Sequence, residues 1–123
     1  RYINDNTLNG MTSFTQQEKM AMAKILMDIV SVDEKIDVRE TLYFEKVKDI
    51  LELTTQDHFE LLNLNTLMCL SIVKRLSDEQ KTYFAEMMRH MILADEYIDP
   101  KEASSFYDIC DFIQIHGVGL NAE

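Results

Sequence analysis

The sequence contains few of the residues that break helices and strands, since its 123 residues include only three glycines and one proline. An all-β domain needs frequent tight turns, and glycine and proline supply most of them. The two cysteines stand far apart, without the CxxC or Cys/His spacing of a zinc site, so we expect two buried thiols. No apolar run approaches the roughly 20 residues that span a bilayer, which predicts no direct membrane insertion.

Positive charge is also scarce. The chain has 12 Lys and Arg against 22 Asp and Glu, a formal net charge of −10. A surface this negative repels phosphate backbones and anionic lipids, so we expect no nucleic-acid partner. Cations and basic protein surfaces remain as partners. No segment resembles a secretory signal, and the expected location is cytoplasmic.

Apolar residues recur at three- and four-residue intervals, and no stretch alternates long enough to predict a strand. The clearest stripe is formed by Phe84, Met87, Met88, Met91 and Ile92. We predict an all-α bundle of about six or seven helices, a single domain over residues 15–116 between a polar arm (1–14) and a tail (117–123). The expected helices cover 16–32, 38–53, a short segment after Thr54 or Thr55 that holds Phe59 and Leu62, and three more that begin after Asn65, after a Ser77–Gln80 capping box and after Asp99.

Two acidic segments repeat one another. DEKIDVRE covers residues 33–40 and DEYIDPKE covers residues 95–102, with five of eight positions identical. They belong to a longer repeat, because a shift of 62 positions overlays residues 22–53 on 84–115 and keeps the apolar stripe. The sequence therefore predicts two duplicated helical hairpins, each with an acidic turn.

Helix capping explains part of each segment. Asp37 and Asp99 are placed as N-caps, and Glu40 and Glu102 follow three residues later, where a carboxylate can reach back to the N–H of the cap residue. Pro100 falls at the first helical position, which tolerates a missing N–H. On this interpretation the acidic segments only start the second helix of each hairpin.

Capping does not explain the first two acidic residues of each segment, Asp33 and Glu34 or Asp95 and Glu96. They lie at the C-terminal ends of the preceding helices, where the helix dipole disfavours an anion by about 0.3–1 kcal/mol. The start of the next helix or a bound cation would offset that penalty. An EF-hand is excluded, because Glu34 and Glu96 stand where its loop requires glycine. An oxygen site for Ca²⁺ or Mg²⁺ stays open, with these candidate ligands: Asp33, Glu34, Asp37, Glu40, Asp95, Glu96, Asp99 and Glu102.

Two helical hairpins, each with a D-x-x-I-D-x-x-E turn and separated by a shorter helical segment, resemble the TerB family of tellurite-resistance proteins and its relatives. The resemblance covers about residues 15–115. It implies an all-helical fold with an acidic surface that binds divalent metal, in bacterial stress-response systems beside membrane-associated and other partner proteins. It carries metal binding over to the following residues: Asp33, Asp37, Glu40, Asp95, Asp99 and Glu102. The family commonly has glycine after the first Asp, whereas this chain has Glu34 and Glu96, which add two ligands but lose easy access to positive φ.

Two functions follow as hypotheses. The first is a non-enzymatic TerB-like stress-response domain that binds divalent cations through its acidic turns. The alternative is an acidic protein–protein interaction module, with a basic or membrane-associated partner, in which the turns are only helix caps. We expect no enzyme, because the sequence contains no glycine-rich phosphate loop and no nucleophile elbow. No two of His58, His90 and His116 share a helix at the four-residue spacing of a metal pair.

Overall fold

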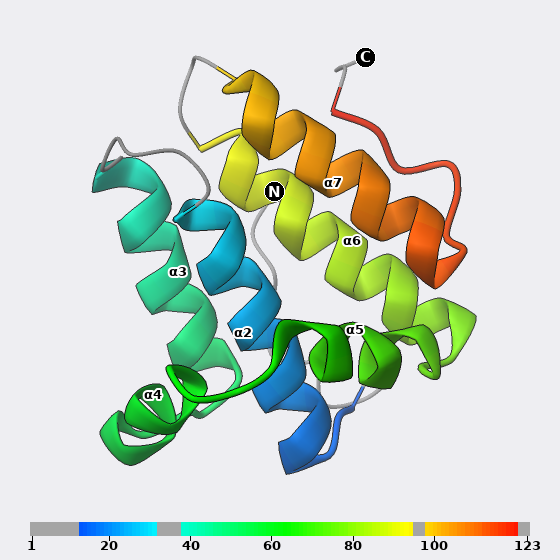
Figure 1. The fold of residues 1–123 in the computed structure, drawn as a ribbon. Helices are drawn as coiled ribbons and strands as arrows, with labels where there is room; N and C mark the ends of the chain where they lie inside the picture. The colour runs from blue at the N-terminus through cyan, green and yellow to red at the C-terminus, as the bar shows by residue number, and fades with distance from the viewer. Residues whose placement is uncertain (1–12, 32–37, 95–97, 121–123) are drawn as a thin grey trace.

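The structure is a computed structural model, and it describes residues 13–31, 38–94 and 98–120. Across those residues it contains six helices and no strand, which confirms the predicted all-α bundle (Figure 1). The helices are α2 (Gln16–Val30), α3 (Val38–Ile50), α4 (Thr55–Leu61), α5 (Thr66–Lys74), α6 (Asp78–Ile92) and α7 (Pro100–Ile113).

The helix starts follow local sequence signals. A capping box opens α2, where the Thr15 hydroxyl accepts from the Glu18 N–H and the Glu18 carboxylate accepts from the Thr15 N–H. The predicted Ser77–Gln80 box opens α6 in the same way. Thr54, rather than Thr55, caps α4, and the predicted cap at Asn65 opens α5. Each cap satisfies N–H groups that have no partner within the helix.

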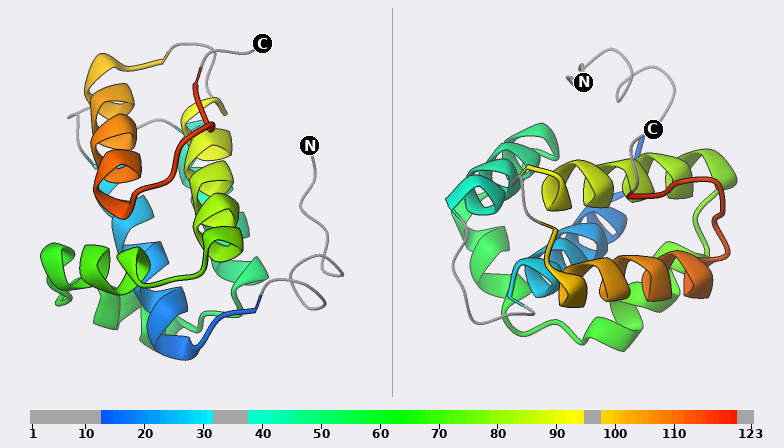
Figure 2. Two further views of the ribbon diagram at one scale, coloured as in Figure 1. Left: turned by 90° about the vertical axis from the view of Figure 1, so that its right-hand side faces the viewer. Right: turned by 90° about the horizontal axis from the view of Figure 1, so that it is seen from above.

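Two antiparallel pairs, α2 with α3 and α6 with α7, form most of the bundle, and α5 lies across it (Figures 1 and 2). The sequence predicted packing between successive helices, yet the most extensive contact joins α2 to α5, which are not successive. Helix α2 also contacts α3, α4 and α7, so it occupies the centre of the domain (Figure 2). Helices α2 and α6 end, and α3 and α7 begin, at the same end of the bundle (Figure 1).

The core is built from the predicted stripes. All five apolar residues predicted for α6 are buried, and Phe106 and Ile113 of α7 pack with them. Cys69 and Cys110 are buried free thiols, as expected. Several positions related by the 62-residue shift are buried in both hairpins: Leu26 and Met88, Ile29 and Met91, Phe44 and Phe106, and Leu51 and Ile113. Superposition of the two hairpins stays a prediction.

Some local predictions differ from the structure. Helix α7 ends at Ile113, before the predicted tail at residues 117–123, because Gln114 adopts the left-handed conformation (φ 64°) that terminates a helix. The described part of the tail packs back onto the bundle. Arg89 Nε donates to the Gly119 carbonyl at 2.9 Å, and the side chain of Leu120 is buried.

Candidate functional site

The three candidate ligands that the structure describes lie where α3 and α7 begin: Glu40, Asp99 and Glu102. The remaining five, Asp33, Glu34, Asp37, Asp95 and Glu96, fall outside the described residues. The predicted cap at Asp37 is among these five. Since α3 and α7 start at the same end of the bundle, the described parts of both acidic segments, residues 38–40 and 98–102, lie at that end (Figure 1).

Asp99 is the N-cap of α7, as the sequence predicts. Its backbone is extended (φ −70°, ψ 129°), and its carboxylate accepts from the Lys101 N–H at 2.8 Å. Its carbonyl accepts the first helical hydrogen bond, from the Ala103 N–H at 2.9 Å. Pro100 occupies the first helical position, where the proline ring favours a helical φ and restricts Asp99 to the extended conformation. The carboxylate of Asp99 therefore has a defined structural role.

Glu40 and Glu102 are more deeply buried than capping requires. Their exposed fractions are only 3 % and 2 %, and they are the only buried carboxylates among the described residues. Glu18, which closes the capping box of α2, is only half-buried. A buried carboxylate is costly unless hydrogen bonds or positive charge compensate it, and both glutamates have polar or electrostatic interactions. The positive end of each helix dipole adds to that compensation.

The described residues alone do not complete a cation site. No three of their His, Cys, Asp and Glu side chains are arranged to hold a metal ion. Any site at this end of the bundle would therefore need carboxylates from residues 32–37 and 95–97. The described glutamates, Glu40 and Glu102, belong to different hairpins and occupy equivalent positions in the repeat.

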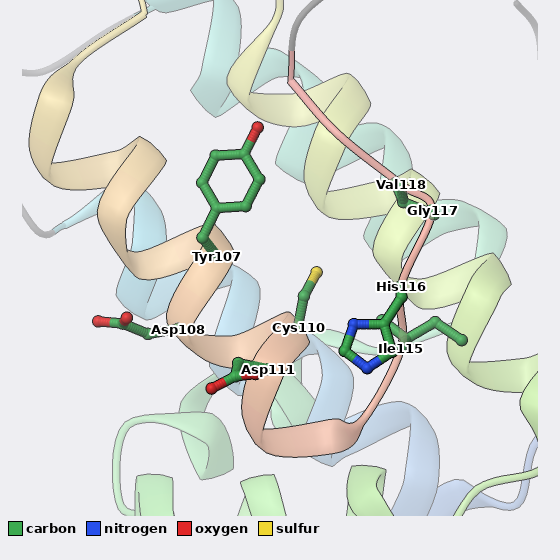
Figure 3. A pocket seen from close by; sticks show the side chains of 8 residues that line it. All are labelled: Tyr107, Asp108, Cys110, Asp111, Ile115, His116, Gly117 and Val118. Carbon is green, nitrogen blue, oxygen red and sulfur yellow. The ribbon is translucent and has the colours of Figure 1, made fainter.

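A pocket of about 420 Å³ lies between the end of α7 and the tail. Figure 3 shows the carboxylates of Asp108 and Asp111 pointing away from His116, which lies on the tail. Burial raises the pKa of the Cys110 thiol to about 11, so this thiol is a poor nucleophile near neutral pH. The ionisable groups of this pocket do not converge on one point, and we assign no chemistry to it.

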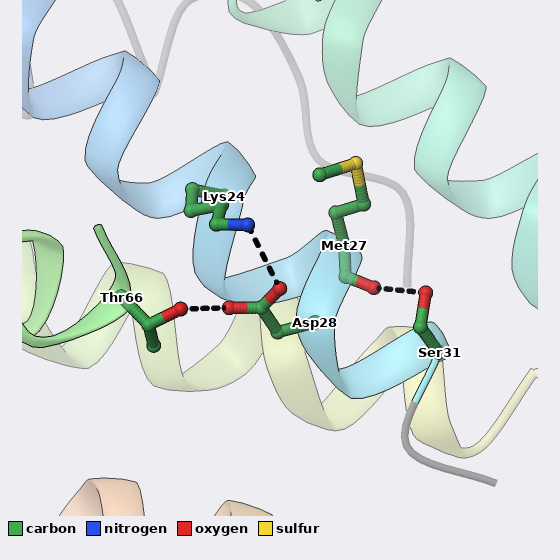
Figure 4. Close-up of polar contacts among 5 residues, drawn as sticks. All are labelled: Lys24, Met27, Asp28, Ser31 and Thr66. Atoms are coloured by element: carbon green, nitrogen blue, oxygen red, sulfur yellow. Dashed lines mark hydrogen bonds and ion pairs between the residues drawn. The ribbon is translucent and has the colours of Figure 1, made fainter. Parts of the chain in front are cut away.

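A second pocket, of about 240 Å³, lies among α2, α5 and α7. Asp28 lines it, and Figure 4 shows both carboxylate oxygens of Asp28 in use. One accepts from the Thr66 hydroxyl at 2.6 Å, and the other lies 3.2 Å from Lys24 Nζ. This arrangement holds the start of α5 against α2. Asp28 is not among the residues predicted from the sequence, where its only local signal is the four-residue spacing from Lys24.

Tyr43, a half-buried tyrosine of α3, has a buried hydroxyl near Tyr83 and Glu86 of α6. Burial, followed by the nearby Tyr83 and Glu86, raises the pKa of Tyr43 to about 12. The Tyr43 hydroxyl makes no hydrogen bond within the described part of the chain. This phenol stays neutral at physiological pH, and no base lies within hydrogen-bonding distance of it there, so we assign it no catalytic role.

Comparison with known proteins adds a fold and no function. No family model matches the chain, and no curated protein matches it. The solved structures that are similar include that of a protein of unknown function, PG1108, from Porphyromonas gingivalis W83. The match has a TM-score of 0.70 at 19 % identity and covers 88 % of this chain and 90 % of that one. At this identity the likeness concerns the fold, and the resemblance to the TerB family stays a hypothesis.

Proposed function

We propose that this protein is a non-enzymatic, TerB-like domain that binds divalent cations, Ca²⁺ or Mg²⁺, at the end of the bundle where α3 and α7 begin. The observation that supports the proposal is the burial of Glu40 and Glu102 at equivalent positions of the repeat. The described carboxylates of Glu40, Asp99 and Glu102 lie near the starts of α3 and α7, in a chain with a net charge of −10. A hard divalent cation favours oxygen ligands and would relieve their mutual repulsion.

The proposal is tested by calorimetric titration with CaCl₂ and MgCl₂, together with thermal unfolding. A ligand that binds only the folded state at 100 times its dissociation constant adds about 2.7 kcal/mol of stability. For a domain of this size the melting temperature should rise by roughly 10 °C. NaCl at matched ionic strength is the control, because screening of the negative charge also stabilises the fold.

A double variant, Asp33→Asn with Asp95→Asn, removes two candidate ligands and leaves the cap at Asp99 intact. A rise in melting temperature that only divalent cations produce, and that the double variant loses, supports the proposal. A rise that NaCl reproduces, or that the double variant retains, contradicts it.

The second candidate is an acidic interaction module with a basic protein partner, and the role of Asp99 favours it. A carboxylate that accepts from the Lys101 N–H is already used in starting α7. If the other acidic residues act in the same way, the acidic segments are structural and the negative surface serves association. Absence of any calorimetric heat with Ca²⁺ or Mg²⁺ would favour this candidate.

A further inference from the structure

Four large apolar side chains are exposed within ten consecutive residues where α4 passes into α5. We call this the α4–α5 apolar surface: Phe59 and Leu62 from α4 and its C-cap, and Leu67 and Met68 from α5. Their exposed fractions lie between 58 % and 72 %. Of the eight large hydrophobic side chains that the described residues expose, half belong to this short stretch. Scattered single exposures are ordinary, but clustering of this kind indicates an interaction site.

Poor packing of α4 and α5 does not explain this exposure. Leu61 is buried from α4, and Cys69 and Val73 are buried from α5. The exposed residues are therefore the outer faces of two helices whose inner faces are already packed. The five-residue step from Leu62 to Leu67 spans at most about 17 Å. Leu62 and Leu67 therefore lie within the length of a partner helix of about 12 residues.

The sequence that forms this surface carries acidic side chains, and among the described residues the cation placed against α4 is Lys48, whose Nζ lies 2.9 Å from His58 Nδ1. From Asp49 to Val73 the sequence contains no Lys or Arg, but it contains four carboxylates: Asp49, Glu52, Asp57 and Glu60. Two of the other exposed apolar residues, Phe112 and Val38, lie beside cations in space or in sequence. Lys74 Nζ stands 4.7 Å from the ring centroid of Phe112, and Val38 is followed directly by Arg39. The α4–α5 apolar surface therefore combines apolar contact area with negative charge.

We propose that the α4–α5 apolar surface docks a basic amphipathic helix of a partner protein. Such a helix presents an apolar stripe flanked by Lys and Arg, which complements both properties of the surface. A second copy of this chain is a poor occupant, because association would bring together two chains that each carry a net charge of −10. An anionic membrane is repelled for the same reason.

This docking site does not depend on cation binding. Helices α4 and α5 lie at the end of the bundle opposite the starts of α3 and α7 (Figure 1). The inference gives the interaction-module candidate a location, and it can hold whether or not the acidic segments bind Ca²⁺ or Mg²⁺. Its failure would likewise leave the cation proposal standing.

The test uses a fluorescent synthetic helix of about 18 residues, with leucine on one face and lysine elsewhere. A scrambled peptide of the same composition has the same charge without an apolar face. Binding to the full chain is followed by fluorescence anisotropy. The double variant Phe59→Gln, Leu67→Gln should bind the amphipathic peptide about tenfold more weakly, or weaker still, than the wild type does. Both residues are exposed, so the melting temperature should stay close to that of the wild type.

The chain offers a matched control pair on α3. Val38 and Leu42 are 67 % and 63 % exposed, similar to the residues of the docking surface. The double variant Val38→Gln, Leu42→Gln should bind the amphipathic peptide with an affinity within about twofold of that of the wild type. A second double variant of the docking surface, Leu62→Gln, Met68→Gln, should show the same loss of peptide affinity as Phe59→Gln, Leu67→Gln. Agreement between the two excludes the possibility that the loss comes from misfolding at one position.

Three results would overturn the inference. In the first, the scrambled peptide binds as tightly as the amphipathic one, which would assign binding to net charge alone. In the second, the control pair on α3 weakens binding as much as the surface pair. In the third, sedimentation shows that the wild type is a dimer and that the double variant Phe59→Gln, Leu67→Gln is a monomer, which would assign the surface to contact with a second copy of the chain. The Asp33→Asn, Asp95→Asn variant should bind the peptide as the wild type does, which separates this test from the test for cations.

Discussion

The cap at Asp99 supports a quantitative prediction. Replacing Asp99→Ala removes the acceptor that lies 2.8 Å from the Lys101 N–H, at a helix start where Pro100 already lacks an N–H. Loss of an N-cap lowers the free energy of unfolding by about 0.5–2 kcal/mol, typically about 1 kcal/mol. For a domain of this size 1 kcal/mol lowers the melting temperature by about 4 °C. In urea the unfolding midpoint should fall by about 0.3–1 M.

Asp99→Asn is the matched variant, because its amide oxygen can still accept from the Lys101 N–H. It loses the favourable interaction of the negative charge with the helix dipole, about 0.3–1 kcal/mol. Removing one negative charge from a chain of net charge −10 offsets part of that loss. We therefore expect Asp99→Asn to unfold within about 0.5 kcal/mol of the wild type. Equal destabilisation by the two variants would refute the capping argument, and no destabilisation by either would show that α7 does not depend on this cap.

Three further outcomes are expected. Phe106 is fully buried, so Phe106→Ala should lower the free energy of unfolding by about 3–5 kcal/mol in urea titrations. Phe106→Leu should lower it by less than about 1.5 kcal/mol, and equal losses in the two variants would show a loosely packed core. Cys69 and Cys110 should react with a thiol reagent at pH 8 only after denaturation, because both are buried and burial raises both pKa values; rapid reaction of the folded chain would contradict their burial. The hydrogen bond from the Thr54 N–H lowers the pKa of Asp57 from 3.8 in the folded state. The stability that the ionised Asp57 contributes is therefore present above that value and is lost as the pH falls through the lower folded pKa. Asp57→Asn should lose less stability than the wild type between about pH 5 and pH 2, and parallel acid titrations of the two proteins would refute this.

The sequence predicted the helix starts well, because each depends on residues within one turn. Ser77 and Gln80 identify their capping box without reference to the rest of the chain. Asp99 and Pro100 mark the start of α7 in the same way. The stripe of α6 was equally clear, since a helix with one apolar face must bury it. These elements follow from spacing alone.

Other features depend on contacts between distant segments, and spacing could not show them. The α4–α5 apolar surface is an example, because α4 has only seven residues and its periodicity does not distinguish inner from outer faces. The sequence named Phe59 and Leu62 as its apolar residues, whereas Leu61 is the one buried. The hydrogen bond from Thr66 to Asp28 joins residues 38 positions apart. The depth of Glu40 and Glu102 likewise depends on how each helix start packs against the bundle.

The central position of α2 has a consequence for how the domain holds together. Helix α2 belongs to the first hairpin, yet its most extensive contact is with α5, and it also contacts α7 of the second hairpin. The two halves of the chain are therefore interlocked rather than placed side by side. A single cut between Leu62 and Asn63, which are both exposed, should leave two fragments that remain associated as one particle. Neither fragment alone would retain a complete core, so the domain should unfold in one cooperative step even though its sequence is a repeat.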